Sequence, residues 1–159
     1  MAEAYPADRA WELIDKVQIC SLVTVSGGAI HSRPMSSMPR QDEHAIYFLT
    51  SANSQKSAEI GESEDVELIY ADPHAQKYVS VAGQARIAND RVKIRELWTP
   101  FAKAWWDGPD DPDIRLLTVR PVRGQYWDSP GTIASSIAML AAAVTGTRPA
   151  GQESKETAL

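Results

Sequence analysis

The chain has 159 residues, a formal net charge of −5 and a single cysteine, Cys20. This length fits one domain of ordinary size that buries its core without disulfides. The acidic balance excludes a general nucleic-acid binder, because phosphate backbones require a basic surface. A lone cysteine and an N-terminus without an apolar signal core predict a cytoplasmic protein. No membrane span is expected, since the longest apolar stretch, residues 133–144, is shorter than the roughly 20 residues required.

The first predicted element is a helix over residues 5–16. Pro6 suits the first helical position, and apolar residues recur at helical spacing on one face. These residues are Ala7, Ala10, Trp11, Ile14 and Val17. We expect this face to cover one end of a small β-barrel.

Short apolar and β-branched runs separated by turn formers then predict a β-meander. Strands are expected at residues 18–25, 29–37 and 44–50. Gly27 and Gly28 favour a hairpin between the first two strands, because glycine adopts positive φ at little cost. Pro34 cannot donate a ladder hydrogen bond, so its strand belongs at a sheet edge or a bulge.

A short helix follows the third strand, capped by Ser51 or Asn53 and ending near Gly61. Its apolar face is thin, with Ala58 and Ile60 alone, which indicates a helix placed for its N-terminus rather than for packing.

Polar side chains gather around that helix N-terminus. The hydroxyls of Thr50 and Ser51 end the strand, and Lys56 and Ser57 follow within one helical turn. Free N–H groups and the helix dipole favour negative charge there. Arg33 on a neighbouring strand adds a forked donor. The sequence therefore predicts an anion site, with a phosphate as its ligand.

The rest of the chain alternates strands and helices. Strands are expected at residues 66–71, 77–89, 114–119 and 124–127, with Arg120-Pro121 separating the last two. Helices are expected at residues 91–98, 101–106 and 131–145. In the long strand Val79, Val81, Gly83, Ala85 and Ile87 share one face, directed into the barrel. Gln84 lies on the other face, which contacts solvent, a ligand or a partner.

These elements predict one domain over residues 1–146, mainly β with helices (α+β), followed by a mobile polar tail over residues 147–159. Trp105 and Trp106 are adjacent, so they cannot both join one helix-packing stripe. One of them is expected at an interface, where aromatic residues are enriched.

Several pieces of the chain, in order, resemble the pyridoxamine 5′-phosphate oxidase-like family of FMN-binding split barrels, and within it the bacterial general stress protein branch. The pieces are RPM at 33–35, YFLTS at 47–51, Lys56, VSVAGQARI at 79–87, the tryptophan pair ending at Trp106, and QYWD at 125–128. The resemblance implies a split β-barrel, FMN, and a homodimer with the flavin at the subunit interface. Backbone groups of Pro34 and Met35 would then contact the polar edge of the flavin ring.

The anion site and the resemblance together give one set of expected cofactor-binding residues. They are Arg33, Pro34, Met35, Leu49, Thr50, Ser51, Lys56, Ser57, Gln84, Trp106 and Trp127. Gln84 is equally well explained as an interface side chain, and Trp127 as a core tryptophan. The lysine that the family often carries after QYWD is absent from Ser129-Pro130-Gly131-Thr132.

No catalytic side chain and no metal site are predicted. His31, His44 and His74 are scattered without metal-ligand spacing, and Cys20 lies in an apolar strand where an inert thiol is expected. A bound cofactor would therefore carry the chemistry.

The leading hypothesis is a stress-related, FMN-dependent oxidoreductase of small molecules, with a nicotinamide or another donor. The alternatives are a non-catalytic flavin-binding or flavin-storage protein, and a split barrel that binds F420 or haem. True pyridoxamine phosphate oxidase activity is not expected, because that enzyme's C-terminal arginine segment is not recognisable after Trp127.

Overall fold

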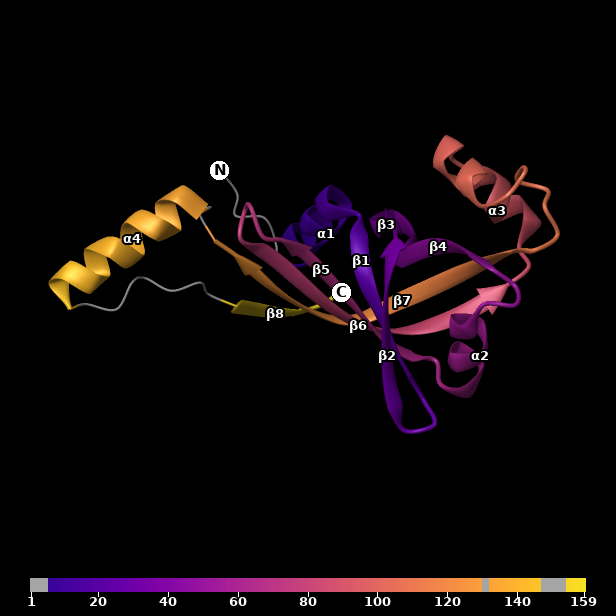
Figure 1. Cartoon of the computed structure of the whole chain (residues 1–159), viewed down its shortest axis with the longest axis horizontal. Coiled ribbons are helices and arrows are strands. Elements are labelled where there is room, and N and C mark those ends of the chain that lie inside the picture. The colour runs from indigo at the N-terminus through magenta and orange to yellow at the C-terminus, as the bar shows by residue number, and fades with distance from the viewer. Residues whose placement is uncertain (1–5, 130–131, 147–153) are drawn as a thin grey trace.

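The structure, a computed structural model, describes residues 6–129, 132–146 and 154–159. Its strands form one antiparallel sheet in the order β2-β1-β5-β6-β7-β4-β3, with β8 paired to β7 (Figure 1). The strands are β1 Ile19–Ser26, β2 Ala29–Ser36, β3 Met38–Arg40, β4 Ala45–Ser51, β5 Asp65–Asp72, β6 Lys77–Ala88, β7 Ile114–Asp128 and β8 Ser154–Ala158. The α-helices are α1 Pro6–Val17, α2 Gln55–Glu62, α3 Arg91–Leu97 and α4 Thr132–Thr145, and the 3₁₀ helices are η1 Gln41–Glu43 and η2 Pro100–Ala104.

The sheet curls so that its two end strands come together at Ser37. β2 and β3 lie at opposite ends of the strand order, yet a single residue, Ser37, separates them in sequence. The buried Ser37 donates both its N–H and its hydroxyl to the carbonyl of Gln18, at 2.8 and 2.7 Å. The sheet is therefore a split barrel, and the predicted mainly β architecture with added helices is confirmed.

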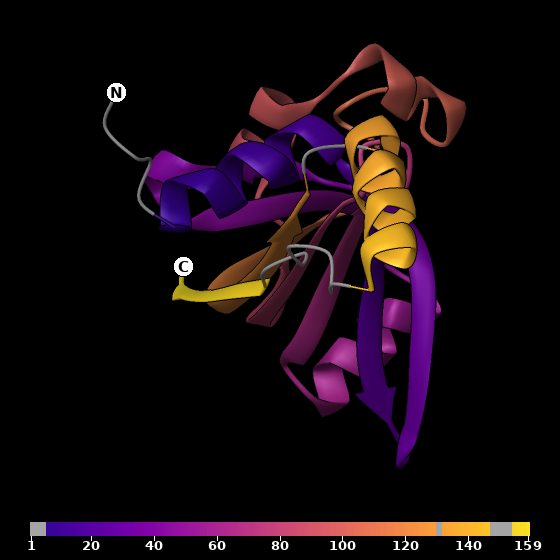
Figure 2. The ribbon, with the colours of Figure 1, turned by 90° about the vertical axis from the view of Figure 1, so that its left-hand side faces the viewer.

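The barrel interior is apolar and closed at one end by α1. Alternate residues of β1, β5 and β6, such as Leu22, Leu68 and Val81, are fully buried. The apolar face of α1 packs on them through Trp11 and Ile14, as the sequence predicted. Figures 1 and 2 show α1 beside the sheet. Fully burying one such side chain stabilises the fold by roughly 1.5–3 kcal/mol.

A second apolar cluster covers the outer face of β4 and β7. Tyr47 and Leu116 point away from the barrel and pack against Ile94 and Leu97 of α3. β4 is thus buried on both faces, which explains why residues Ala45 to Phe48 form an uninterrupted buried run instead of an alternating one. The barrel and the α3 layer share this strand, so its C-terminal end is held from two sides.

Two expectations about strand and helix limits were wrong, and one short strand was missed. The two strands expected around Arg120-Pro121 are one strand, β7, because a bulge absorbs the proline: Ala82 pairs with Arg123 but Gly83 pairs with Pro121, which leaves Val122 without a partner in the ladder. The strand expected at residues 29–37 is β2, which ends one residue earlier, and the short strand β3 that follows Ser37 was not predicted. The cap of α2 is Ser54, and neither Ser51 nor Asn53.

Part of the polar tail forms a strand. Residues 147–153 lie outside the described residues, but Ser154–Ala158 form β8 on the edge of β7 from Arg123 to Trp127. β4 pairs only with the first half of β7, so the second half offers an open edge that another strand can cover. Leu159 then packs against Gly124 and the barrel core.

A substitution at Gly83 would test the close packing at the bulge. A Cβ atom there would lie 2.7 Å from the carbonyl oxygen of Arg120 and 2.9 Å from Cγ1 of Val119. We expect Gly83→Ala to lower the free energy of unfolding by about 1–3 kcal/mol, because backbone atoms must shift. The measurement is urea unfolding followed by tryptophan fluorescence. The control is Gly61→Ala in α2, where nothing lies within 4 Å of the added Cβ. Equal stability of the Gly83 variant and wild type would contradict the close approach.

Candidate functional site

A chain of hydroxyl groups lies where β4 ends and α2 begins. The Oγ atom of Ser54 is 3.2 Å from Oγ1 of Thr50 and 2.8 Å from Oγ of Ser57. The Ser57 hydroxyl also lies 3.1 Å from the carbonyl oxygen of Ser51, to which it donates. Three of the residues predicted to bind phosphate, Thr50, Ser51 and Ser57, are therefore together at one helix N-terminus, with Ser54 as an additional member.

Arg33 reaches the same region from the barrel's edge strand. It is opposite Leu22 in the β1–β2 register, so its side chain lies on the inner face of the sheet. Its guanidinium donates to Oγ1 of Thr24 at 2.9 Å and to Oε2 of Glu59 at 2.5 Å. The Thr24 hydroxyl donates to the same carboxylate oxygen at 2.6 Å. Arg33 of β2 is thus hydrogen-bonded to α2 through the buried carboxylate of Glu59.

Lys56 lies beside this pair on α2. The pKa of its amine is lowered, first by burial and then by the positive charge of Arg33, and the carboxylate of Glu59 opposes this shift. Two cations therefore share one carboxylate in a partly desolvated space. An anion bound between Arg33 and Lys56 would relieve their repulsion, which is what a phosphate site requires.

Glu59 is the member of this cluster that sequence reasoning missed. It is only 3% exposed. Burial alone would raise the pKa of its carboxyl, but the hydrogen bonds from Thr24 and Arg33 and the charge of Arg33 outweigh burial and hold it below the ordinary value. Its Oε1 atom has no hydrogen-bond partner, and Nδ1 of His31 lies 3.7 Å away.

Two signals in the sequence pointed to this cluster. Lys56 and Glu59 are three residues apart, so they share one face of α2, the face that also carries the buried Ile60. Thr24 continues the inward alternation of Cys20 and Leu22 on β1, which puts a hydroxyl at a core position. A polar residue at a core position requires a buried partner, and that partner is Glu59.

The other expected cofactor-binding residues lie apart from this cluster. Pro34 is exposed on β2, an end strand as predicted, and Met35 packs against the barrel core. Leu49 and Trp106 belong to the outer cluster under α3. The buried Nε1 of Trp106 has no hydrogen-bond partner among the described residues, whereas the neighbouring Trp105 is largely exposed.

Gln84 and Trp127 do not join Arg33 within one chain. Gln84 is exposed opposite Asp65 on the outer face of β6. Trp127 is half-buried, paired with Tyr78 of β6 on one side and with β8 on the other. Their roles at a cofactor stay predictions.

The remaining reactive groups show no second site. Burial raises the pKa of the Cys20 thiol to about 12, so it is the inert buried thiol that the sequence predicted. In the described part of the chain, no three His, Cys, Asp or Glu side chains come close enough to hold a metal ion. Within residues 6–129, 132–146 and 154–159, no helix has the length and apolar character needed to cross a bilayer.

The lowered pKa of Glu59 makes a pH-dependent stability difference testable. Because the folded state favours the charged carboxylate, the stabilisation is complete above its unfolded pKa, near 4.5, and is lost as pH falls through the lower folded pKa. Glu59→Gln should lower the free energy of unfolding by about 1–2 kcal/mol at pH 7, since neutral hydrogen bonds replace charged ones. The difference from wild type should shrink toward pH 3.

Urea unfolding of the ligand-free protein between pH 7 and pH 3 measures this difference in the free energy of unfolding. Glu62→Gln is the matched control, with the same charge change on the same helix but at an exposed position bonded to Ser26. If both substitutions lower the free energy of unfolding equally at pH 7, the buried Arg33–Glu59 pair stabilises the fold no more than the exposed contact of Glu62 does.

Known proteins match this chain over most of its length. A family model described as pyridoxamine 5′-phosphate oxidase like matches residues 6–150. General stress protein 26 of Bacillus subtilis is 32% identical over 113 residues, which cover 69% of this chain and 79% of that protein.

Solved structures share the fold. A general stress protein 26 from Jannaschia sp. CCS1 matches with a TM-score of 0.77 at 24% identity, covering 96% of this chain and 97% of that one. The general stress FMN/FAD binding protein of Xanthomonas citri matches with a TM-score of 0.68 at 25% identity, covering 79% of this chain and 89% of that one. With most of its length matched and the split barrel shared, this chain belongs to the pyridoxamine 5′-phosphate oxidase-like family.

Proposed function

We propose that this protein is a stress-related flavoprotein that binds FMN and passes hydride or electrons from a nicotinamide or another donor to a small molecule. The observation that carries the proposal is that Arg33 and Lys56 both interact with the charge of Glu59 on α2, the helix whose N-terminus carries the hydroxyl chain. The positive charges of Arg33 and Lys56 exceed the single negative charge of Glu59. The excess positive charge lies on the helix that begins with a row of hydroxyls. A phosphate ester fits this donor set.

Residues of this chain would hold the two ends of the cofactor differently. Arg33, Lys56 and the hydroxyls of Thr50, Ser51 and Ser57 would bind the phosphate. β2 ends the sheet, so the side of its backbone away from β1 is open to a ring near Pro34 and Met35. A bound flavin supplies the redox chemistry, and the protein supplies position and a polar environment for the ring. The similar protein from Xanthomonas citri is a general stress FMN/FAD binding protein, which supports a flavin as the ligand.

A homodimer would complete the site. Gln84 lies on the outer face of β6 and Trp127 lies beside β8, whereas Arg33 lies on the inner face of the sheet. A second protomer would bring such residues to the flavin. A closed two-fold dimer is the commonest soluble assembly and would form two equal flavin sites.

The phosphate end is tested by Lys56→Ala. A charge-assisted contact to a buried anion is worth about 1.5–3 kcal/mol, so FMN affinity should fall roughly ten- to hundredfold, while riboflavin, which has no phosphate, should lose little. Fluorescence quenching titrations of both flavins measure the change.

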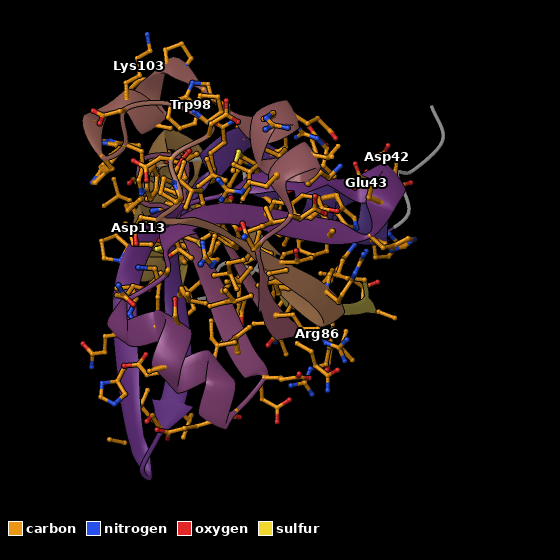
Figure 3. All side chains as sticks on the ribbon, turned by 90° about the vertical axis from the view of Figure 1, so that its right-hand side faces the viewer. Asp42, Glu43, Arg86, Trp98, Lys103 and Asp113 are labelled. Carbon is orange, nitrogen blue, oxygen red and sulfur yellow. The ribbon has the colours of Figure 1, made fainter. Side chains whose placement is uncertain are left out.

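Lys103→Ala is the matched control, because Lys103 lies on η2 and far from α2 (Figure 3). If both flavins weaken equally in the Lys56 variant, Lys56 does not bind the phosphate. If wild type binds neither flavin and takes up F420 or haem instead, its visible spectrum will show which one.

The redox step is tested by stopped-flow reduction of the FMN-loaded protein with NADPH or NADH. We expect His31→Gln, His44→Gln and His74→Gln each to stay within about tenfold of wild type, roughly 1.4 kcal/mol in barrier, because no side-chain acid is expected to serve the flavin ring. A thousandfold loss in one variant that still holds FMN would reveal a general acid. Absence of reduction by either nicotinamide would favour a non-catalytic flavin-binding or storage protein.

A further inference from the structure

The second half of β7 pairs with a strand whose own side chains are mostly exposed. β8 lies antiparallel to residues 123–127 of β7, with Arg123 opposite Ala158 and Trp127 opposite Ser154 (Figure 1). Four of the five side chains of β8 are exposed, and the fifth, that of Thr157, is half-buried. Backbone pairing along the edge of β7, rather than burial of side chains, therefore holds β8 itself in place.

Leu159, directly after β8, is the apolar anchor of this segment. Its side chain packs against the apolar core of the barrel. It lies so close to Gly124 that a Cβ atom added to the glycine would be 2.5 Å from Cδ1 and 2.9 Å from Cγ of the leucine. We name the space beside Gly124 that this side chain fills the Leu159 seat. The absence of a side chain at Gly124 thus makes room for an aliphatic group next to the strand edge.

The polar contacts of β8 add little to this anchor. Nε of Arg123 lies 3.5 Å from Oε1 of Glu156, but the two side chains are 64% and 62% exposed, and exposed ion pairs contribute little to stability. The hydroxyl of Thr157 donates to the carbonyl of the adjacent Ala158, within β8 itself. Release of Leu159 would leave β8 held mainly by backbone pairing, and segments with few buried contacts open locally while the rest of a domain stays folded.

The edge that β8 covers is suited to receive an extended chain. β4 pairs with β7 only as far as Val119, so the edge from residue 123 onward is left for β8. A strand edge with free N–H and C=O groups accepts an extended segment, with main-chain bonds supplying affinity and side-chain pockets supplying specificity. The Leu159 seat supplies the specificity here, because the side chains of β8 are mostly directed to solvent.

We propose that the edge of β7 over residues 123–127 is an acceptor site for an extended peptide, and that β8 is a releasable strap that occupies this site in its own chain. The peptide class is a polar five-residue stretch followed by an aliphatic residue, the pattern of residues 154–159. The main chain of the stretch pairs with β7, and the aliphatic side chain enters the Leu159 seat. The acceptor site uses none of the residues proposed to bind phosphate, and it does not depend on flavin binding.

Release of the strap is tested in the whole 159-residue chain by Leu159→Asp, because a carboxylate is costly to place in an apolar seat. Ala158→Asp is the matched control, with the same charge change at the neighbouring exposed position. Amide hydrogen exchange followed by NMR should become at least tenfold faster at the amides of residues 123–127 that face β8 in the Leu159 variant, and should match wild type in the control. Exchange in β1 and β5 should stay unchanged in both variants.

Faster exchange throughout the barrel in the Leu159 variant would show that β8 is an integral part of the fold and not a releasable strap. Unchanged exchange at residues 123–127 would show that Leu159 does not hold the strap closed. Either result overturns the proposal.

The acceptor site is tested with a peptide of residues 154–159, labelled with fluorescein at its first residue and amidated at its last. Fluorescence anisotropy should show at least tenfold tighter binding to the Leu159 variant than to wild type or to the Ala158 control, in which the strap competes for the edge. The same peptide with Asp in place of its leucine should bind the Leu159 variant at least tenfold more weakly. Adding Gly124→Val to the Leu159 variant should also abolish binding, since the valine side chain fills the seat.

Equal binding of the peptide by wild type and the Leu159 variant would overturn the acceptor site, as would binding that is unaffected by the leucine-to-aspartate change in the peptide. Absence of binding to a Leu159 variant whose residues 123–127 exchange freely would overturn it as well. Titration of the same proteins with FMN is a separate measurement. A chain that binds the peptide as expected but takes up no flavin would count against the proposed function alone.

Discussion

Closure of the sheet is the constraint on which the rest of this structure depends. One residue, Ser37, separates the two end strands, and its bonds to the Gln18 carbonyl join the beginning of β1 to the beginning of β3. A sheet that closes in this way must send the inner faces of β1 and β2 toward α2. Arg33 and Thr24 thereby come within hydrogen-bond distance of Glu59, although 26 and 35 residues separate them from it in sequence.

The buried carboxylate gives the site its character. Without Glu59, Arg33 and Lys56 would repel each other in a space with little water, and each would lose solvation with no compensation. With Glu59 present, Arg33 is hydrogen-bonded on the inner face of the sheet, whereas the amine of Lys56 has no such bond to the carboxylate. The proposed site is therefore formed within the folded chain, a form of preorganisation that would lower the cost of binding an anion.

Incompleteness of the single chain connects the cofactor to assembly. The phosphate end of the proposed flavin site is built by α2, β2 and β4, whereas Trp127 lies near the opposite end, where β7 meets β8. The exposed α4 follows the same end of β7. A partner that brings Trp127 to the flavin would therefore bring this end of β7 with it.

The sequence by itself determined the elements whose signal is local. Alternation in β6 indicated which side chains enter the barrel. The helical spacing of Trp11 and Ile14 indicated the apolar face of α1 that closes one end of it. Hydroxyls and Lys56 directly after a strand indicated the N-terminus of α2. Only the tertiary structure decided the features that depend on distant partners. Pro121 continues β7 because β6 accommodates a bulge opposite it, β8 forms because β4 leaves half of β7 uncovered, and Glu59 becomes a buried ion-pair partner because barrel closure brings Arg33 to it. Each of these is a contact between segments far apart in the chain, and short-range patterns do not encode such contacts.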